Sequence, residues 1–234
     1  QAPLFARQDA MIHLQPFPIK VLQEIIGTYN PHYTAEDLLA LFAITGGVAQ
    51  YVKVLMQNQA ATKEEMINTA ISNGLFLSEG QLMLISEFKN NYSVNFEILE
   101  RLANGATDRN ELVSAFPQID ISAHLKRLEE FYRLIVRNEP IAMPVRYKKV
   151  RYKLNDQFLK FWFKFMFPYK SMIESGYTAR IIERAQQIFP DYSGRVLEEL
   201  VIESALESEK FTAVGQWWDK KGENEIDLIC IDDI

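Results

Sequence analysis

Acidic residues near the C-terminus are placed where they could ligate a divalent cation. Glu198 lies in a segment with helical spacing, and Glu225 and Asp227 lie in a strand-like run. Mg²⁺ prefers a few carboxylates together with water. Asp227 stands out because its neighbours Ile226 and Leu228 predict a buried strand. The metal interpretation of Glu198 and Asp227 competes with a simpler one, in which the acids are surface charges.

A run of basic residues in the middle of the chain could contact phosphate groups. Residues 146–153 hold five positive charges and no acid, at Arg146, Lys148, Lys149, Arg151 and Lys153. Nucleic acids present a dense line of phosphates, along which a basic strand next to an exposed helix fits. The alternative is a solvated strand edge, where lysines block edge-to-edge association.

The helix expected just before this run adds basic side chains. Residues 121–133 have an apolar stripe on one side and carry Lys126, Arg127 and Arg133 on the other. Two glutamates accompany them and would repel phosphate. We therefore expect contacts with the nucleic-acid backbone and weak base readout.

Several catalytic motifs are absent from the sequence. No glycine is followed by lysine, so there is no P-loop, and there is no G-x-G-x-x-G pattern. The three histidines lack the H-E-x-x-H spacing, and no serine lies in G-x-S-x-G. We expect His124 to be a packed neutral histidine. The chain by itself is not a complete P-loop ATPase.

The composition is that of a globular protein with more than one folded unit. Of 234 residues, 48% are hydrophobic and 24% are charged. A single cysteine, Cys230, excludes an internal disulfide and favours a reducing compartment, the cytoplasm. Residues 198–234 carry 11 acidic and 3 basic side chains, against 20 and 22 in residues 1–197. The two regions therefore need separate interpretations.

No segment has the run of about 20 apolar residues that crosses a membrane. The chain begins with Gln1 and shows no signal-peptide pattern. We expect a fragment of a longer polypeptide and no membrane partner.

Helical spacing of apolar residues predicts four or five short helices within residues 18–90. Thr34 precedes one of them. Thr62 is followed three residues later by Glu65, and Ser78 by Gln81, which is the capping-box spacing of a helix start.

Three helices and two strands are expected in residues 91–155. The helices cover residues 96–103, 108–116 and 121–133, and the strands 134–136 and 149–154. This is the element order of a winged helix. The second strand alternates apolar and basic residues, so one side should pack and the other should be positive.

The last third of the chain combines an aromatic segment with helices and a hairpin. Residues 158–167 are aromatic nearly all round and predict a buried helix at a domain junction, too short for a membrane span. Two helices, 181–189 and 194–206, should precede two strands, 211–218 and 225–231, joined by a turn. A two-stranded hairpin packed on helices is an incomplete domain.

Taken in order, six motifs resemble the archaeal-type AAA+/STAND P-loop ATPases. They are LFAR (4–7), IHLQPF (12–17), TGGVAQY (45–51), DQFLKFWF (156–163), GQWWD (215–219) and EID (225–227). The resemblance covers essentially the whole chain. It implies a mainly α fold with small β elements that begins after an ATPase core.

The resemblance also implies a division of the chain. Its parts are a strand and linker from the core (1–17), the helical lid (18–90), the winged helix (91–155), aromatic-rich junction helices (156–190), and an incomplete α/β domain resembling PD-(D/E)XK nucleases (191–234). The core in cis, with ATP and Mg²⁺, would belong to the longer protein, and no tightly bound cofactor is expected in this chain.

Individual residues acquire roles from the resemblance. Arg7, Gly46 and Gly47 match positions near the bound nucleotide. Glu198 and Asp227 match the first two acidic positions of the nuclease-like domain. The strand that carries a further acid and a lysine in active nucleases is missing, so this chain should be inactive as a nuclease.

Three functions remain open at this stage. The first is a regulatory module that binds DNA, or RNA, through the winged helix. The second is an ATP-dependent protein-interaction scaffold without nucleic-acid contact. A homo-oligomer of the chain is also possible. The third is a metal-dependent nuclease in the longer protein.

Overall fold

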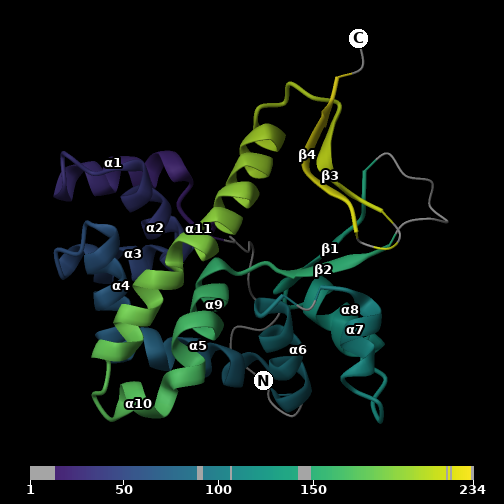
Figure 1. The fold of residues 1–234 in the computed structure, drawn as a ribbon, viewed down its shortest axis with the longest axis horizontal. Helices are drawn as coiled ribbons and strands as arrows, with labels where there is room; N and C mark the ends of the chain where they lie inside the picture. Colours follow the sequence, from purple (N-terminus) through teal and green to yellow (C-terminus); the bar gives the residue numbers. More distant parts are fainter. Residues whose placement is uncertain are drawn as a thin grey trace, which may run out of the picture.

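The computed structural model of the chain describes residues 14–88, 92–105, 107–141, 149–219, 221 and 223–232. Over these residues the protein is mostly helical and has two separate two-stranded antiparallel sheets (Figure 1). This agrees with the mainly α fold with small β elements that the sequence predicts. Among the described helices, none combines the length and the apolar character needed to cross a membrane.

The described part of the chain opens with five helices. They are α1 (Ile19–Tyr29), α2 (Ala35–Thr45), α3 (Ala49–Gln57), α4 (Lys63–Ser72) and α5 (Gly74–Phe88). Capping boxes formed by Thr34 and Thr62 begin α2 and α4, as the spacing predicts. The start expected at Ser78 is wrong. Ser78 lies inside α5, because the Asn73 side chain accepts a hydrogen bond from the Leu75 N–H and begins the helix earlier.

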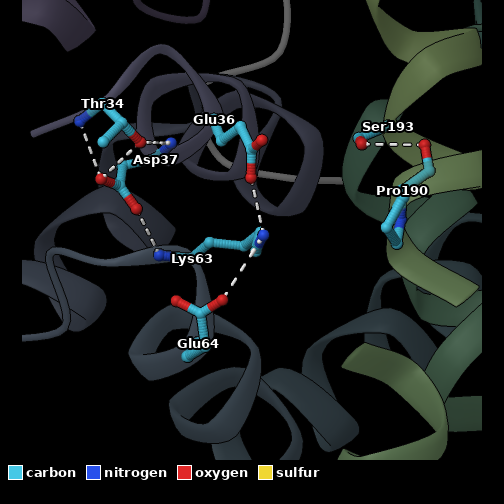
Figure 2. Close-up of polar contacts among 7 residues, drawn as sticks. All are labelled: Thr34, Glu36, Asp37, Lys63, Glu64, Pro190 and Ser193. Atoms are coloured by element: carbon cyan, nitrogen blue, oxygen red, sulfur yellow. Dashed lines mark hydrogen bonds and ion pairs between the residues drawn. The ribbon is translucent and has the colours of Figure 1, made fainter. Parts of the chain in front are cut away.

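One buried carboxylate joins the starts of α2 and α4 (Figure 2). Asp37 Oδ2 accepts hydrogen bonds from the backbone N–H and the hydroxyl of Thr34, both at 2.8 Å, and Oδ1 accepts one from the Lys63 N–H at 2.7 Å. Burial acts to raise the pKa of Asp37, but these hydrogen bonds outweigh it and lower the pKa. Lys63 Nζ then pairs with Glu36 at 2.7 Å and with Glu64 at 3.4 Å. A charged network thus fixes the two helices to each other.

Three helices and a hairpin follow, in the order that the sequence predicts. They are α6 (Tyr92–Ala103), α7 (Arg109–Ser114), α8 (Ser122–Glu130), β1 (Ile135–Asn138) and β2 (Arg151–Leu154). The strands pair antiparallel, with Ile135 opposite Leu154, and a bridge between Asp108 and Arg151 adds a short third edge. The apolar stripe of α8 is buried, as expected. This helix ends at Glu130, before the expected end, and Arg133 has a left-handed backbone with φ of 56°.

The aromatic segment forms the core, as predicted, but it is not one regular helix. It consists of α9 (Gln157–Phe161), a π-helical turn η3 (Trp162–Met166), a 3₁₀ turn η4 (Phe167–Tyr169) and α10 (Lys170–Glu174). Pro168 has no backbone N–H and interrupts the helical ladder. Trp162 is fully buried, and its Nε1 donates to the Leu77 carbonyl at 3.0 Å. A Cβ on Gly80 would lie 2.5 Å from this indole, so only glycine fits there.

One long helix, α11 (Ala179–Glu207), replaces the two helices expected in this region. Pro190 lies inside it and removes a single backbone donor without ending the helix. Ser193 Oγ donates to the Pro190 carbonyl at 3.1 Å (Figure 2). Phe189 and Val196 are buried on either side of the proline, and α11 packs against α2 and α4, so the helix continues past Pro190.

The chain continues into the C-terminal hairpin, β3 (Ala213–Trp218) and β4 (Glu225–Ile231), close to the expected bounds. Ala213 pairs with Ile231 and Trp218 with Glu225, with an irregularity between Gly215 and Trp217. In Figure 1 the hairpin extends from the distal end of α11 down to β1 and β2. Two parts of the chain that are distant in sequence therefore meet at this point.

Candidate functional site at strand β2, helix α8 and the C-terminal hairpin

The basic side of β2 faces the C-terminal hairpin. Tyr152 and Leu154 are buried on the opposite side of the strand, as the alternation predicts. Arg151 and Lys153 contact residues of β4 and β3. The sequence leads us to expect a positive side that is open to phosphate, and the structure instead covers it with the hairpin.

Arg151 is held by two contacts with the hairpin. Its Nη1 lies 3.0 Å from Glu225 Oε2, and its guanidinium carbon lies 4.6 Å from the centre of the Trp218 ring. Trp218 is only 2% exposed, and its Nε1 donates to the Lys149 carbonyl at 2.8 Å. A cation–π contact and a charge-assisted hydrogen bond therefore occupy the same guanidinium.

Lys153 is half-buried against the hairpin. Its Nζ donates to Gln216 Oε1 at 2.7 Å. Burial lowers the pKa of Lys153, Glu199 opposes this effect, and Lys160 adds to it. This lysine is not available to a phosphate in the observed arrangement.

Lys149 forms an ion pair within the unit of α6, α7, α8, β1 and β2, which we call the three-helix unit. Its Nζ lies 2.9 Å from Asp108 Oδ2, the residue that caps α7. Burial acts to raise the pKa of Asp108, and the hydrogen bond from Lys149 outweighs it, so the pKa is lowered. Arg146 and Lys148, which complete the predicted basic run, lie outside the described residues, and their role stays a prediction.

Helix α8 keeps its basic side chains in solvent. Lys126 is exposed and lies 3.8 Å from Glu130, a loose pair at helical spacing. Arg127 is exposed and has no carboxylate within ion-pair distance in the part of the chain that the structure describes. Sequence reasoning missed Phe131, which lies one turn after Arg127 and is 75% exposed. Its position outside the predicted apolar stripe was the available signal.

The two predicted nuclease-like acids lie on neighbouring elements. Glu198 on α11 and Asp227 on β4 are both exposed. Partial burial raises the pKa of Glu198, and the negative charge of Asp227 raises it further, which places the two carboxylates within electrostatic range. The expectation that Asp227 lies in a buried strand is wrong, because β3 and β4 form a sheet of only two strands in the described residues.

No group of three or more His, Cys, Asp or Glu residues suited to a metal ion occurs within the described ranges. Glu198 and Asp227 are only two residues, so they offer a cation fewer protein ligands than such a group. Their metal role, and their catalytic role, stay predictions.

A cleft of about 890 Å³ lies beside this region. Residues of α11, β2, β3 and the segment that precedes α1 line it. Lys160 Nζ pairs across it with Glu199 at 2.5 Å. Burial, followed by the charges of Glu207 and Glu199, raises the pKa of Glu203. The cleft therefore has an acidic wall formed by α11.

Gly46 and Gly47 form the turn that ends α2. Both have left-handed backbones, with φ of 58° and 73°. A Cβ on Gly47 would lie 2.3 Å from the Phe17 carbonyl oxygen, and one on Gly46 would lie 3.1 Å from Gln157 Cβ. The chain itself fills the space at these glycines, so packing explains their identity, and their position near a bound nucleotide stays a prediction. Arg7 lies outside the described residues, and its nucleotide-sensing role stays a prediction.

His124 is packed, as expected. Its Nδ1 lies 2.7 Å from Oδ1 of the fully buried Asn95. Burial and the nearby Arg127 lower the pKa of His124, which favours the neutral imidazole.

Comparison with known proteins gives two matches. Residues 162–234 match a domain family described as archaeal and bacterial proteins of unknown function, DUF234. An uncharacterized protein of Methanocaldococcus jannaschii, MJECL04, is 29% identical over 243 residues, an alignment that covers 100% of this chain and 52% of the relative. The chain thus spans about half the length of this curated relative. No solved structure matches it.

Proposed function

We propose that residues 18–155 form the helical lid and winged-helix portion of an ATP-dependent switch protein, and that this portion binds nucleic acid through α8. The succession of five helices and a unit of three helices and a hairpin supports this architecture. The ATP-dependent part rests on the sequence resemblance and belongs to the longer protein.

The outward side of α8 carries the nucleic-acid proposal. Arg127 is exposed and lacks a carboxylate partner among the described residues, and Lys126 is only loosely paired. A guanidinium of this kind binds a phosphate without first breaking an ion pair. Phe131 offers a ring on which an unpaired base can stack. Of the basic residues that the sequence predicts for the contact, the proposal therefore rests on Lys126 and Arg127 of α8, because the hairpin engages Arg151 and Lys153 of β2.

A metal-dependent phosphodiesterase in the longer protein is the second candidate. The observation that favours it is the influence of Asp227 on the pKa of Glu198, with the charge of Lys153 acting on the same carboxylate. Glu198 and Asp227 would hold Mg²⁺ through their oxygens, and the ion would polarise a phosphate. Titration of the chain with Mg²⁺, next to the Glu198→Gln variant, measures whether the pair binds a cation.

The test of the main proposal is fluorescence anisotropy with labelled duplex and single-stranded DNA at about 50 and about 150 mM salt, because phosphate contacts weaken steeply with salt. We expect Arg127→Glu to weaken binding several-fold and to lower the slope of log K against log salt by about 1 or 2. Arg180→Glu is the matched control, since Arg180 is an exposed arginine on α11.

Two results would contradict the proposal. Equal effects of Arg127→Glu and Arg180→Glu would show that only net charge matters. Absence of binding at about 50 mM salt would leave the scaffold without nucleic-acid contact as the function, because phosphate contacts are strongest at low salt.

A further inference from the structure

We propose that the C-terminal hairpin is a removable cover over a second phosphate-binding surface, formed by Arg151 and Lys153 on β2. The inference rests on the proposed function, which it extends from α8 to the neighbouring strand. The partner is the sugar–phosphate backbone of a nucleic acid.

The first argument is that a carboxylate occupies the position where a phosphate would bind. Glu225 Oε2 lies 3.0 Å from Arg151 Nη1. Arginine presents the same planar set of donors to carboxylates and phosphates. A phosphate and Glu225 therefore compete for one guanidinium.

The second argument is the spacing of the covered side chains. Arg151 and Lys153 alternate with the buried Tyr152 and Leu154, so both lie on the side of the strand that the hairpin covers. Residues two apart in a strand are about 6.7 Å apart, so the two cations can contact neighbouring phosphates of one nucleic-acid strand. The pair thus fits two phosphates of one backbone.

The third argument is that a single buried side chain anchors the cover. Among the described residues from 197 to 232, Trp218 is the only one that is buried. Around it most contacts between the hairpin and the three-helix unit are polar: Glu225 with Arg151, Gln216 with Lys153, and the Ile141 N–H with the Gln216 carbonyl at 2.8 Å. The Ile141 side chain also packs beside Gly215. The hairpin can leave β2 without opening the aromatic core, and polar interfaces of this kind favour relative motion.

Charge is the driving force for the replacement of the hairpin by nucleic acid on β2. The hairpin contributes the Glu225 carboxylate to the basic strand, and the whole segment 198–234 is strongly acidic. When a polyanion binds β2, the acidic hairpin is displaced from it and is repelled by the phosphates. The balance between a hairpin that lies on β2 and a hairpin that has left β2 therefore depends on the presence of nucleic acid.

The experiment compares Glu225→Lys with Glu223→Lys in the full chain. Both substitutions reverse one charge on the same hairpin, but only Glu225 forms an ion pair with β2. We expect Glu225→Lys to bind a labelled 20-base-pair duplex at least fivefold more tightly than Glu223→Lys at about 100 mM salt, with a steeper salt dependence. Addition of the duplex to the wild-type chain should increase hydrogen exchange in β3 and β4 at least twofold.

The outcomes separate this inference from the proposed function. Equal affinities of the two variants, or unchanged exchange in the hairpin, would overturn the inference. If Arg127→Glu still weakened binding in that case, the α8 proposal would stand alone. If Glu225→Lys binds the duplex tightly and Arg127→Glu does not weaken binding, the result would support the β2 surface and overturn the α8 contact. Absence of binding by every variant would overturn both.

Discussion

Arg151 on β2 and Trp218 on β3 are in direct contact, with the guanidinium carbon 4.6 Å from the centre of the indole ring. The indole N–H donates to the carbonyl of Lys149, two residues before Arg151. This contact joins residues 67 positions apart and couples the acidic end of the chain to its most basic strand.

Trp218→Ala should release the hairpin from β2. Truncation of a buried tryptophan costs about 3–5 kcal/mol locally, and no other described residue beyond 197 is buried to compensate. We expect limited proteolysis to cut within residues 208–232 at least tenfold faster. Trp217→Ala is the control, because Trp217 is only partly buried, and an equal acceleration there would argue against a special role of Trp218.

Gly80→Ala should destabilise the aromatic core. The added Cβ would meet the Trp162 indole at 2.5 Å, and overpacking of this kind costs about 1–3 kcal/mol. Urea unfolding followed by circular dichroism measures the change in the free energy of unfolding. Gly74→Ala, where nothing lies within 4 Å, should be neutral or stabilising. A Gly80→Ala variant as stable as the wild type would contradict the packing.

Asp37→Asn should remove part of the acid sensitivity of the protein. The folded-state pKa of Asp37 is lowered from its ordinary value of 3.8, so its ionised form stabilises the fold above that value. The contribution is lost as the pH falls through the lower folded pKa. We expect the variant to lose about 1 kcal/mol at pH 7 and to show a flatter stability curve between about pH 5 and pH 2.

Asp191→Asn is the control for this prediction, because Asp191 is an exposed aspartate. Chemical denaturation at a series of pH values gives both curves. Parallel curves for Asp37→Asn and the wild type would show that the network between α2 and α4 does not depend on the charge.

Asp227→Asn should lower the pKa of Glu198. The negative charge of Asp227 is one of the causes that raise this pKa, and the substitution removes it while keeping the size of the side chain. NMR titration of the glutamate side-chain carbons measures the shift. Asp232→Asn should leave the pKa of Glu198 unchanged, and an unaltered value in the Asp227→Asn variant would show that the two carboxylates do not converge.

Gly47→Ala should displace the segment that precedes α1. The substitution combines a positive φ of 73° with a Cβ placed 2.3 Å from the Phe17 carbonyl oxygen. We expect a loss of about 2–4 kcal/mol in the free energy of unfolding, since the backbone strain adds to the clash. Gly176→Ala has a positive φ of 81° but open space around it, so it isolates the backbone cost from the clash.

Local chemistry made much of the fold predictable. The side-chain oxygens of Thr34 and Thr62 lie next to the N–H groups that they cap, so a few residues of sequence contain the whole interaction. The aromatic segment around Trp162 is too apolar to lie anywhere but in a core. In contrast, the prediction of two helices in place of α11 was wrong, because the burial of side chains on both sides of Pro190 outweighs its one lost hydrogen bond.

The candidate site was less predictable, because its contacts are long-range. Nothing near Lys153 in sequence indicates that Gln216 accepts its hydrogen bond, or that Glu225 pairs with Arg151. Alternation along β2 showed which side chains share a side, but not which side of the strand would be covered. Phe131 was identifiable in principle, because a large aromatic residue outside the buried stripe of its helix must be exposed.

The uninterrupted course of α11 has a mechanical consequence. A helix of 29 residues is about 43 Å long, and the last side chain that is buried in α11 is Val196. The segment 197–207, about 16 Å long, leads from this buried part into the hairpin. A tilt of about 10° over that length displaces the far end by roughly 3 Å, as much as the 3.0 Å separation of Arg151 and Glu225. A tilt of the end of α11 is therefore transmitted to the hairpin as a movement comparable to the length of that ion pair.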